Sequence, residues 1–398
     1  MGDTVVKEDE TVELTKVDGD LKVEDGATIN VPSGTLEISG DLVSKGDIVI
    51  YGAVKVNDIK HDWGYLEIQG DVEAEHVRVS SRRSSNGSKL IITGSLNCQD
   101  IDIDGGLEID KNLTAGDVEI GGSCEVHGET NVKDYDVSGS AKHGMNLNAS
   151  DIEVSGSLKV EGDVISESDF EISGSAKIEG ILKANEIDAG GSLKCQEVKG
   201  VNVNIGGSAR IEFGKIEKIL EVGGSFKCSE SFSSEEVTCG GSCGFGDDTS
   251  IDKLEANGAT TVGDNFLFKD VKVNGAFTFS TNAKGENLEV NGACSSKGLL
   301  KLSEKIIVNG KLSGDRIEGN EIEIAGGLES TETKGQYILI KRESRVRGKI
   351  VGREVIVEDD ARVDHIVADK VKLGDDVKVN KLESSNVDAE DSAKFNLV

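Results

Sequence analysis

The feature that most constrains the fold is a repeat of about 17 residues. In its clearest copy, residues 152–160, an apolar pair is followed by a Gly-Ser corner and then by a second apolar pair. The same arrangement recurs around Gly122, Gly139, Gly174, Gly191, Gly207, Gly224, Gly241, Gly258, Gly275 and Gly292. A unit this short cannot bury its apolar face alone, so neighbouring units must stack on one another.

The positions of the apolar residues within each repeat predict short strands. They lie two and four positions on either side of the corner glycine, and another lies near eight positions after it. Alternation of two predicts strands with one inward face, and the change of phase at the glycine predicts a bend. A second glycine, such as Gly162, marks a further corner. We therefore predict an all-β parallel β-helix, a solenoid with a triangular cross-section, and right-handed winding because that is the usual crossover hand.

The repeat extends over almost the whole chain. We expect a short acidic N-terminal lead at residues 1–14 and an irregular part of the solenoid at 15–121, with loops near 57–65 and 80–89. Regular solenoid is expected over 122–398, because the later coils lose the glycine but keep the register. About 23 coils stacked at the strand spacing of about 4.8 Å predict a rod on the order of 100 to 110 Å long.

The last partial coil is the predicted polymerisation interface. Its inward positions are Val387, Ala389, Ala393 and Phe395, and Leu397 follows them. A solenoid end exposes unpaired strand edges and an apolar cross-section, which must be capped or matched by another copy. We therefore assign the contact to Val387, Ala393, Phe395 and Leu397.

The net charge of the chain and its two basic segments limit which molecules it can bind. The formal net charge of −30 argues against nucleic acid, since phosphate contacts need Lys and Arg, and it opposes binding to an anionic membrane. No signal peptide and no transmembrane stretch are visible, so we expect a cytoplasmic protein. Two basic segments stand out, Arg82-Arg83 and the run Lys341, Arg342, Arg345, Arg347, Lys349 and Arg353. They are candidates for contact with acidic faces of neighbouring copies or with anionic lipid, and ordinary solubilising charge is the alternative.

No pattern in the sequence indicates catalysis. The seven cysteines all fall on inward positions, so we predict buried thiols and neither zinc ligands nor disulfides. The five histidines share no spacing, and we expect them on the surface. Carboxylates alternate with apolar residues, as the solvent side of a strand requires, and no phosphate-binding loop occurs. We therefore expect no enzyme, no cofactor and no metal site.

The glycine corners, the 17-residue coils and segments such as Gly162-Asp163-Val164-Ile165 and Gly70-Asp71-Val72 resemble those of the bactofilins. The resemblance implies a β-helical cytoskeletal protein that polymerises end to end without nucleotide into cytoplasmic scaffolds, often near the membrane. Its expected partner is a second copy of itself, with other scaffold or membrane-associated proteins as further candidates. Bactofilin cores are shorter and carry disordered tails, whereas coils fill most of this chain. Two alternatives stay open: a soluble acidic rod that binds a basic protein, as a DNA mimic does, and a surface stalk.

Overall fold

The structure, a computed structural model, describes residues 2–80 and 87–398. The described residues form strands joined by turns, without a helix. The chain is an all-β parallel β-solenoid of about 23 turns, which confirms the predicted fold class. It forms two compact units, Met1–Gly200 and Val201–Val398, here called the N-terminal and C-terminal units.

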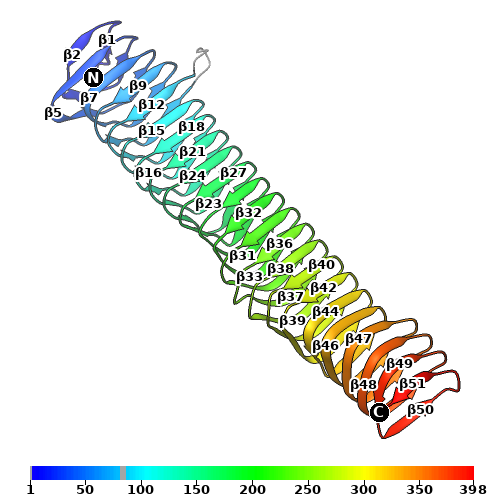
Figure 1. The fold of residues 1–398 in the computed structure, drawn as a ribbon. Coiled ribbons are helices and arrows are strands. Elements are labelled where there is room, and N and C mark those ends of the chain that lie inside the picture. The colour runs from blue at the N-terminus through cyan, green and yellow to red at the C-terminus, as the bar shows by residue number, and fades with distance from the viewer. Residues whose placement is uncertain (1, 81–86) are drawn as a thin grey trace. The chain divides into compact units, whose positions relative to one another are not determined.

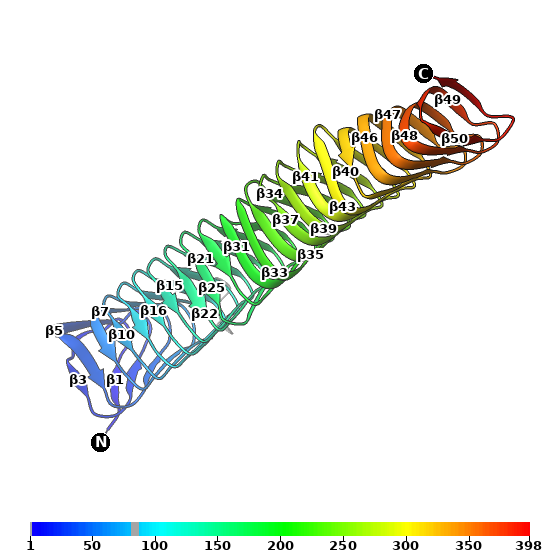
Figure 2. The same cartoon turned by 90° about the horizontal axis from the view of Figure 1, so that it is seen from below.

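The N-terminal unit has three strands in each regular coil. Each strand pairs in parallel with the third strand before it and the third after it, and Figures 1 and 2 show the resulting stack. The first face contains β14 (Asp100–Ile103), β17 (Asp117–Ile120), β20 (Asp134–Val137), β23 (Asp151–Val154), β26 (Asp169–Ile172) and β29 (Glu186–Ala189). The second contains β15 (Gly106–Ile109), β18 (Ser123–Val126), β21 (Ser140–His143), β24 (Ser157–Val160), β27 (Ser175–Ile178) and β30 (Ser192–Lys194). The third contains β16 (Leu113–Thr114), β19 (Thr130–Asn131), β22 (Leu147–Ala149), β25 (Val164–Ser166) and β28 (Ile181–Lys183).

Close backbone contact explains the glycine between the first and second faces. A Cβ placed on Gly156 would lie 2.0 Å from the carbonyl oxygen of Gly139 in the preceding coil. The corner glycines of successive coils therefore stack directly on one another, and only glycine allows the strand spacing to be kept there.

The core is the interior of the coils. Val154, Val160 and Val164, one from each face of a coil, are fully buried. Burying an aliphatic side chain of this kind contributes about 1.5 to 3 kcal/mol, and the repeat supplies several in every coil. The alternation of buried and exposed residues in the strands matches the pattern predicted from the sequence.

In the C-terminal unit, strands often continue around a bend. Examples are β46 (Gly327–Ile340), β47 (Arg345–Val357) and β48 (Arg362–Leu373), which pair in parallel with a register shift where the chain turns. The last coil contains β50 (Asn386–Ala389) and β51 (Lys394–Leu397), which follow β49 (Lys378–Glu383). The register therefore extends into the final residues, as the later apolar pairs indicate.

Two expectations for the N-terminal region were wrong. Residues 1–14 include β1 (Thr4–Val6) and β2 (Thr11–Glu13), which pair with later strands and so belong to the solenoid instead of forming a lead. In the region 57–65, β8 (Asp58–His61) continues the stack and leaves only a tight turn before the next strand. The second expected loop, 80–89, includes residues 81–86, which lie outside the described residues, and β12 (Lys89–Ile92) begins at the last residue of that range.

The described parts of the chain contain no helix that is long and apolar enough to cross a lipid bilayer.

Candidate interaction surfaces

The final coil exposes the apolar side chains that the sequence assigned to an interface. Phe395 is 37% exposed and Leu397 is 63% exposed. Their register partners in the preceding coil, Val379 and Leu382, are 3% and 0% exposed. Val387 and Ala393 are half-buried, whereas equivalent residues of earlier coils are fully buried. The final coil thus presents inward-type positions that no other described coil covers.

Four residues of the second basic segment fall into two pairs with different surroundings. Lys341 is ion-paired with Glu323, and Arg342 with Asp360 at 3.3 Å. Arg345 and Arg347, on β47, are exposed and have no side-chain ion pair with any described residue. Arg82 and Arg83 lie outside the described residues.

Arg345 is the first member of a basic column that runs through the last coils. Parallel register places Arg345 beside Arg362, Arg362 beside Lys378, and Lys378 beside Lys394. All four side chains point outward and are exposed. We call Arg345, Arg362, Lys378 and Lys394 the basic column.

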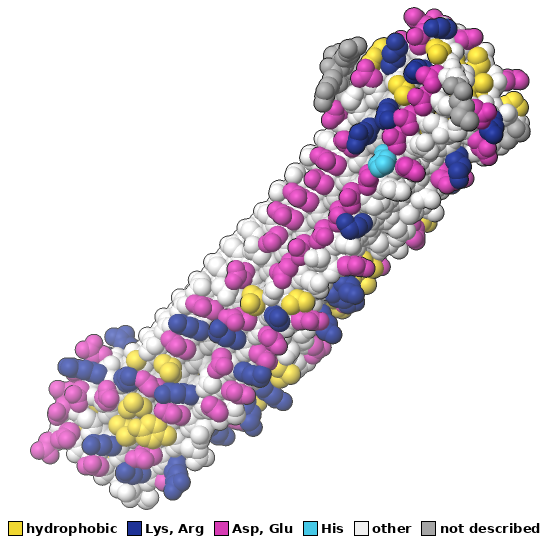
Figure 3. Space-filling view, turned by 180° about the vertical axis from the view of Figure 1, so that it is seen from behind, with side chains coloured by type: hydrophobic (Ala, Val, Ile, Leu, Met, Phe, Trp, Pro, Cys, Tyr) yellow, Lys and Arg dark blue, Asp and Glu magenta, His cyan; other side chains and the backbone are white. Residues whose placement is uncertain are grey.

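A column of opposite charge lies on the first face of the N-terminal unit. It consists of Glu119, Asp136, Glu153, Glu171 and Asp188, which are aligned through five consecutive coils. We call these residues the acidic column. All five are exposed, and none is ion-paired within the described chain. Beside it runs a second row of carboxylates that includes Asp117, Asp134 and Asp151, and Figure 3 shows acidic side chains gathered in such columns.

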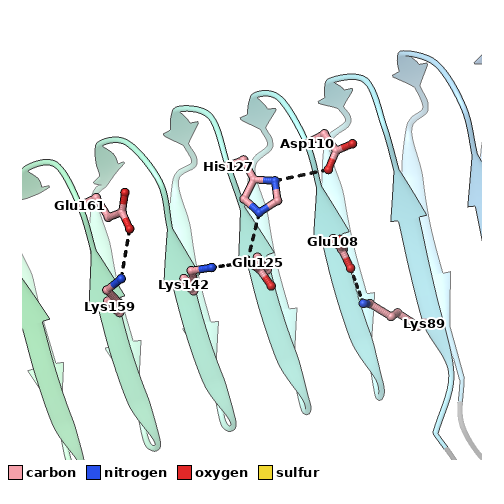
Figure 4. Close-up of polar contacts among 8 residues, drawn as sticks. All are labelled: Lys89, Glu108, Asp110, Glu125, His127, Lys142, Lys159 and Glu161. Carbon is pink, nitrogen blue, oxygen red and sulfur yellow. Dashed lines mark hydrogen bonds and ion pairs between the residues drawn. The ribbon is translucent and has the colours of Figure 1, made fainter.

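The second face carries a different set of charges. Ser140, Ser157, Ser175 and Ser192 form one outward row, and Lys142, Lys159, Lys177 and Lys194 form the next. Most of these lysines have acidic partners: Lys142 contacts Glu125 at 2.5 Å and Lys159 contacts Glu161 at 3.1 Å (Figure 4). The hydrogen bond from Lys142, with a further one from His127, lowers the pKa of Glu125. This face is therefore largely neutralised within the chain.

One group of side chains has the composition of a metal site. Ligand atoms of Asp58, Glu75 and His76 lie within 4.8 Å of one another. His76 Nδ1 is 3.0 Å from Asp58 Oδ1, however, and its Nε2 is 3.2 Å from Asp100 Oδ2. Both ring nitrogens are thus engaged by carboxylates, and the group serves as an ion-pair network between coils. Burial alone would raise the pKa of Asp58, but hydrogen bonds from His76 and Lys60 lower it.

The expectation of surface histidines was wrong for two of the five. His61 and His143 are buried in inward positions of the coil. His143 Nδ1 lies 2.8 Å from the Thr130 hydroxyl, and its Nε2 lies 2.8 Å from the Tyr135 hydroxyl. Burial lowers the pKa of His143 to about 4 and raises that of Tyr135 well above its usual value. This polar network fills the core without access to solvent, which fits a structural role.

The burial of His143 predicts an acid-sensitive unfolding step. Because its folded pKa lies near 4 and its ordinary value is 6.5, the stability it contributes is complete above pH 6.5 and is lost as the pH falls toward 4. The loss should reach about 3 kcal/mol and should show as a lower urea midpoint in pH-dependent unfolding. His143→Gln should flatten this slope. A slope equal to that of the unmodified protein would contradict the assignment.

The cysteines occupy the inward positions predicted for them, but two of them are bonded. All seven are buried, and Cys239 and Cys243 form a disulfide, which corrects the expectation of seven thiols. The two residues flank Gly241 by two positions on either side, so both point into the core at the same corner. Their Cα atoms are 6.3 Å apart, within the range that a disulfide spans. Burial raises the pKa of Cys98, Cys124, Cys228 and Cys294 to about 12.

Thiol counting by intact mass checks this arrangement. Native protein should label slowly, because the thiolate is the reactive form and burial disfavours it. Denatured protein should take up five labels without reductant and seven with it. Seven labels without reductant would show that Cys239 and Cys243 are not bonded.

Two of the larger surface hollows among the described residues have a volume of about 580 Å³ each, one in each unit. The hollow in the C-terminal unit is lined in part by Glu318, whose carboxylate lies 3.6 Å from Lys301 and from Arg316. Comparison with known proteins gives no matching family model, no matching curated protein and no matching solved structure.

Proposed function

We propose that the chain is a non-enzymatic structural protein, similar to the bactofilins, whose solenoids assemble end to end into cytoplasmic filaments or scaffolds without nucleotide. The observation that carries the proposal is the exposure of Phe395 and Leu397 in the final coil, at positions that are buried one coil earlier. A second copy is the partner that offers a matching coil.

Backbone pairing supports the same contact. Among the described strands, β50 pairs only with β48, and β51 only with β49. Their outer edges therefore carry unpaired N–H and C=O groups, which favour addition of a further strand. Because Phe395 is 37% exposed, covering the rest of its surface would add about 0.5 to 1 kcal/mol for each contact, beyond the strand hydrogen bonds.

A second candidate function is binding of a basic protein. The acidic column favours it, because five consecutive coils present carboxylates that are ion-paired with no described residue of their own chain. Salt-sensitive binding to a basic partner in the absence of filaments would support this function over the first.

High-speed sedimentation of the purified full chain tests the proposed function. The protein should pellet as polymer above a threshold concentration, to the same extent with and without ATP or GTP and magnesium. Pelleting that requires nucleotide, or protein that stays in the supernatant at every concentration, would contradict the proposal.

A further inference from the structure

The charges of this chain are arranged in two ways. In much of the C-terminal unit, outward side chains of opposite charge face each other in neighbouring coils. Glu236 contacts its register partner Lys253 at 2.6 Å, and Glu354 contacts its register partner Lys370 at 2.7 Å. Alternation of this kind satisfies the charges within one molecule. The acidic and basic columns depart from this arrangement.

Each column stacks like charges in consecutive coils. At a coil spacing of about 4.8 Å, neighbouring side chains of equal sign repel one another. The repulsion is not relieved inside the molecule, because no member of either column is ion-paired with a described residue. By contrast, the lysine row on the second face has Glu125, Glu161 and Glu179 beside it.

We propose that the basic column of one copy docks on the acidic column of a second copy. Both columns place one charge in each coil, so their charges share the same spacing and four cations can face four of the five carboxylates in register. The outward positions that follow Lys378 and Lys394 are uncharged, Asn380 and Asn396. Four carboxylates lie within two residues of the column. Asp364 accepts hydrogen bonds from the Gly348 N–H and from Asn380, Glu343 and Asp360 are ion-paired with Arg342, and Asp376 lies in the turn before Lys378.

The contact joins different surfaces of the two copies. The acidic column lies in the N-terminal unit and the basic column in the C-terminal unit, so each copy has one of each to offer. A contact between unlike surfaces continues from copy to copy unless a rotation closes it into a ring. This lateral contact adds side-by-side association to the end contact of the proposed function, and it uses different residues.

Charge reversal tests the contact in the full chain. The first variant combines Arg345→Glu, Arg362→Glu and Lys378→Glu, and the second combines Glu119→Lys, Asp136→Lys and Glu153→Lys. All six positions are exposed, so the fold should survive, which circular dichroism checks. Both variants also carry Phe395→Arg, so that loss of end-to-end filaments and loss of the lateral contact are separate readouts.

Sedimentation velocity in about 0.05 M salt should show association of the Phe395→Arg parent that weakens at least about tenfold in 0.5 M salt. Each reversed variant alone should lose this association, and a mixture of the two should regain it, since opposite charges then face each other again. A matched control for the first variant, Lys142→Glu with Lys159→Glu and Lys177→Glu, lowers the net charge by the same amount and should associate like the parent.

Three results would overturn the proposal: a parent that stays monomeric in low salt, a reversed variant that associates like the parent, or a mixture that does not recover. The proposal is also wrong if reversal of the basic column leaves self-association intact but abolishes binding to vesicles of phosphatidylglycerol, because the column would then serve a membrane.

Discussion

Gly191→Ala should destabilise the solenoid by about 3 kcal/mol, the size of an overpacking defect in a closely packed site. A Cβ at this position would lie 1.9 Å from the carbonyl oxygen of Gly174 in the preceding coil, so the coils must separate locally to admit it. The urea midpoint of the full chain, or hydrogen exchange in the coils on either side, measures the effect.

Gly190→Ala is the matched control, because Gly190 is the adjacent residue in the same corner. Its Cβ would lie 3.5 Å from the nearest atom, the carbonyl oxygen of Ser173, which is an ordinary contact. This substitution should be neutral or stabilise the fold by up to about 1 kcal/mol, since alanine restricts the unfolded chain. Equal destabilisation by both substitutions would show that coil stacking at the corner does not depend on the missing Cβ.

Phe395→Arg should abolish end-to-end assembly while leaving the coils folded. The side chain is already partly exposed, so the folded monomer tolerates a cation there, whereas a contact between two ends would bury that charge without a partner. The control is Asn396→Arg, which adds the same charge to the next residue, on the outward side of β51. Sedimentation at equal protein concentration in about 0.5 M salt, where the lateral contact is weak, should show polymer for Asn396→Arg and none for Phe395→Arg.

Local sequence patterns were enough to predict most of the fold. Alternation of apolar residues and the glycine corner depend on neighbouring residues in the sequence, so they predicted the three strands of a coil such as 152–164 and the inward positions of all seven cysteines. The N-terminal coils were harder, because β1 and β2 lack the glycine corner and are identified only by their pairing with later strands.

The features that were not predicted from the sequence depend on contacts between different positions in the coil. The Cys239–Cys243 disulfide depends on how far apart two inward residues lie across one corner. We expected His143 on the surface although it lies four residues after Gly139, which is an inward position. Its burial also requires the hydroxyls of Thr130 and Tyr135 from other strands.

The charge columns are visible in the sequence as charges at fixed offsets from the corner glycine, which the overall composition does not show. Carboxylates recur three residues before the corner glycine, as Glu153 does before Gly156, and in the N-terminal unit lysines recur three residues after it, as Lys159 does. These offsets show that charges are sorted by face. Which charges remain unpaired depends on register and on side-chain contacts, which only the structure supplies.

Negative-stain electron microscopy of the purified full chain tests the central claim most directly. In about 0.5 M salt, where the lateral contact is weak, the account predicts filaments for the unmodified protein without nucleotide, and isolated folded particles for Phe395→Arg. Isolated particles for the unmodified protein, or filaments of normal length for Phe395→Arg, would contradict it.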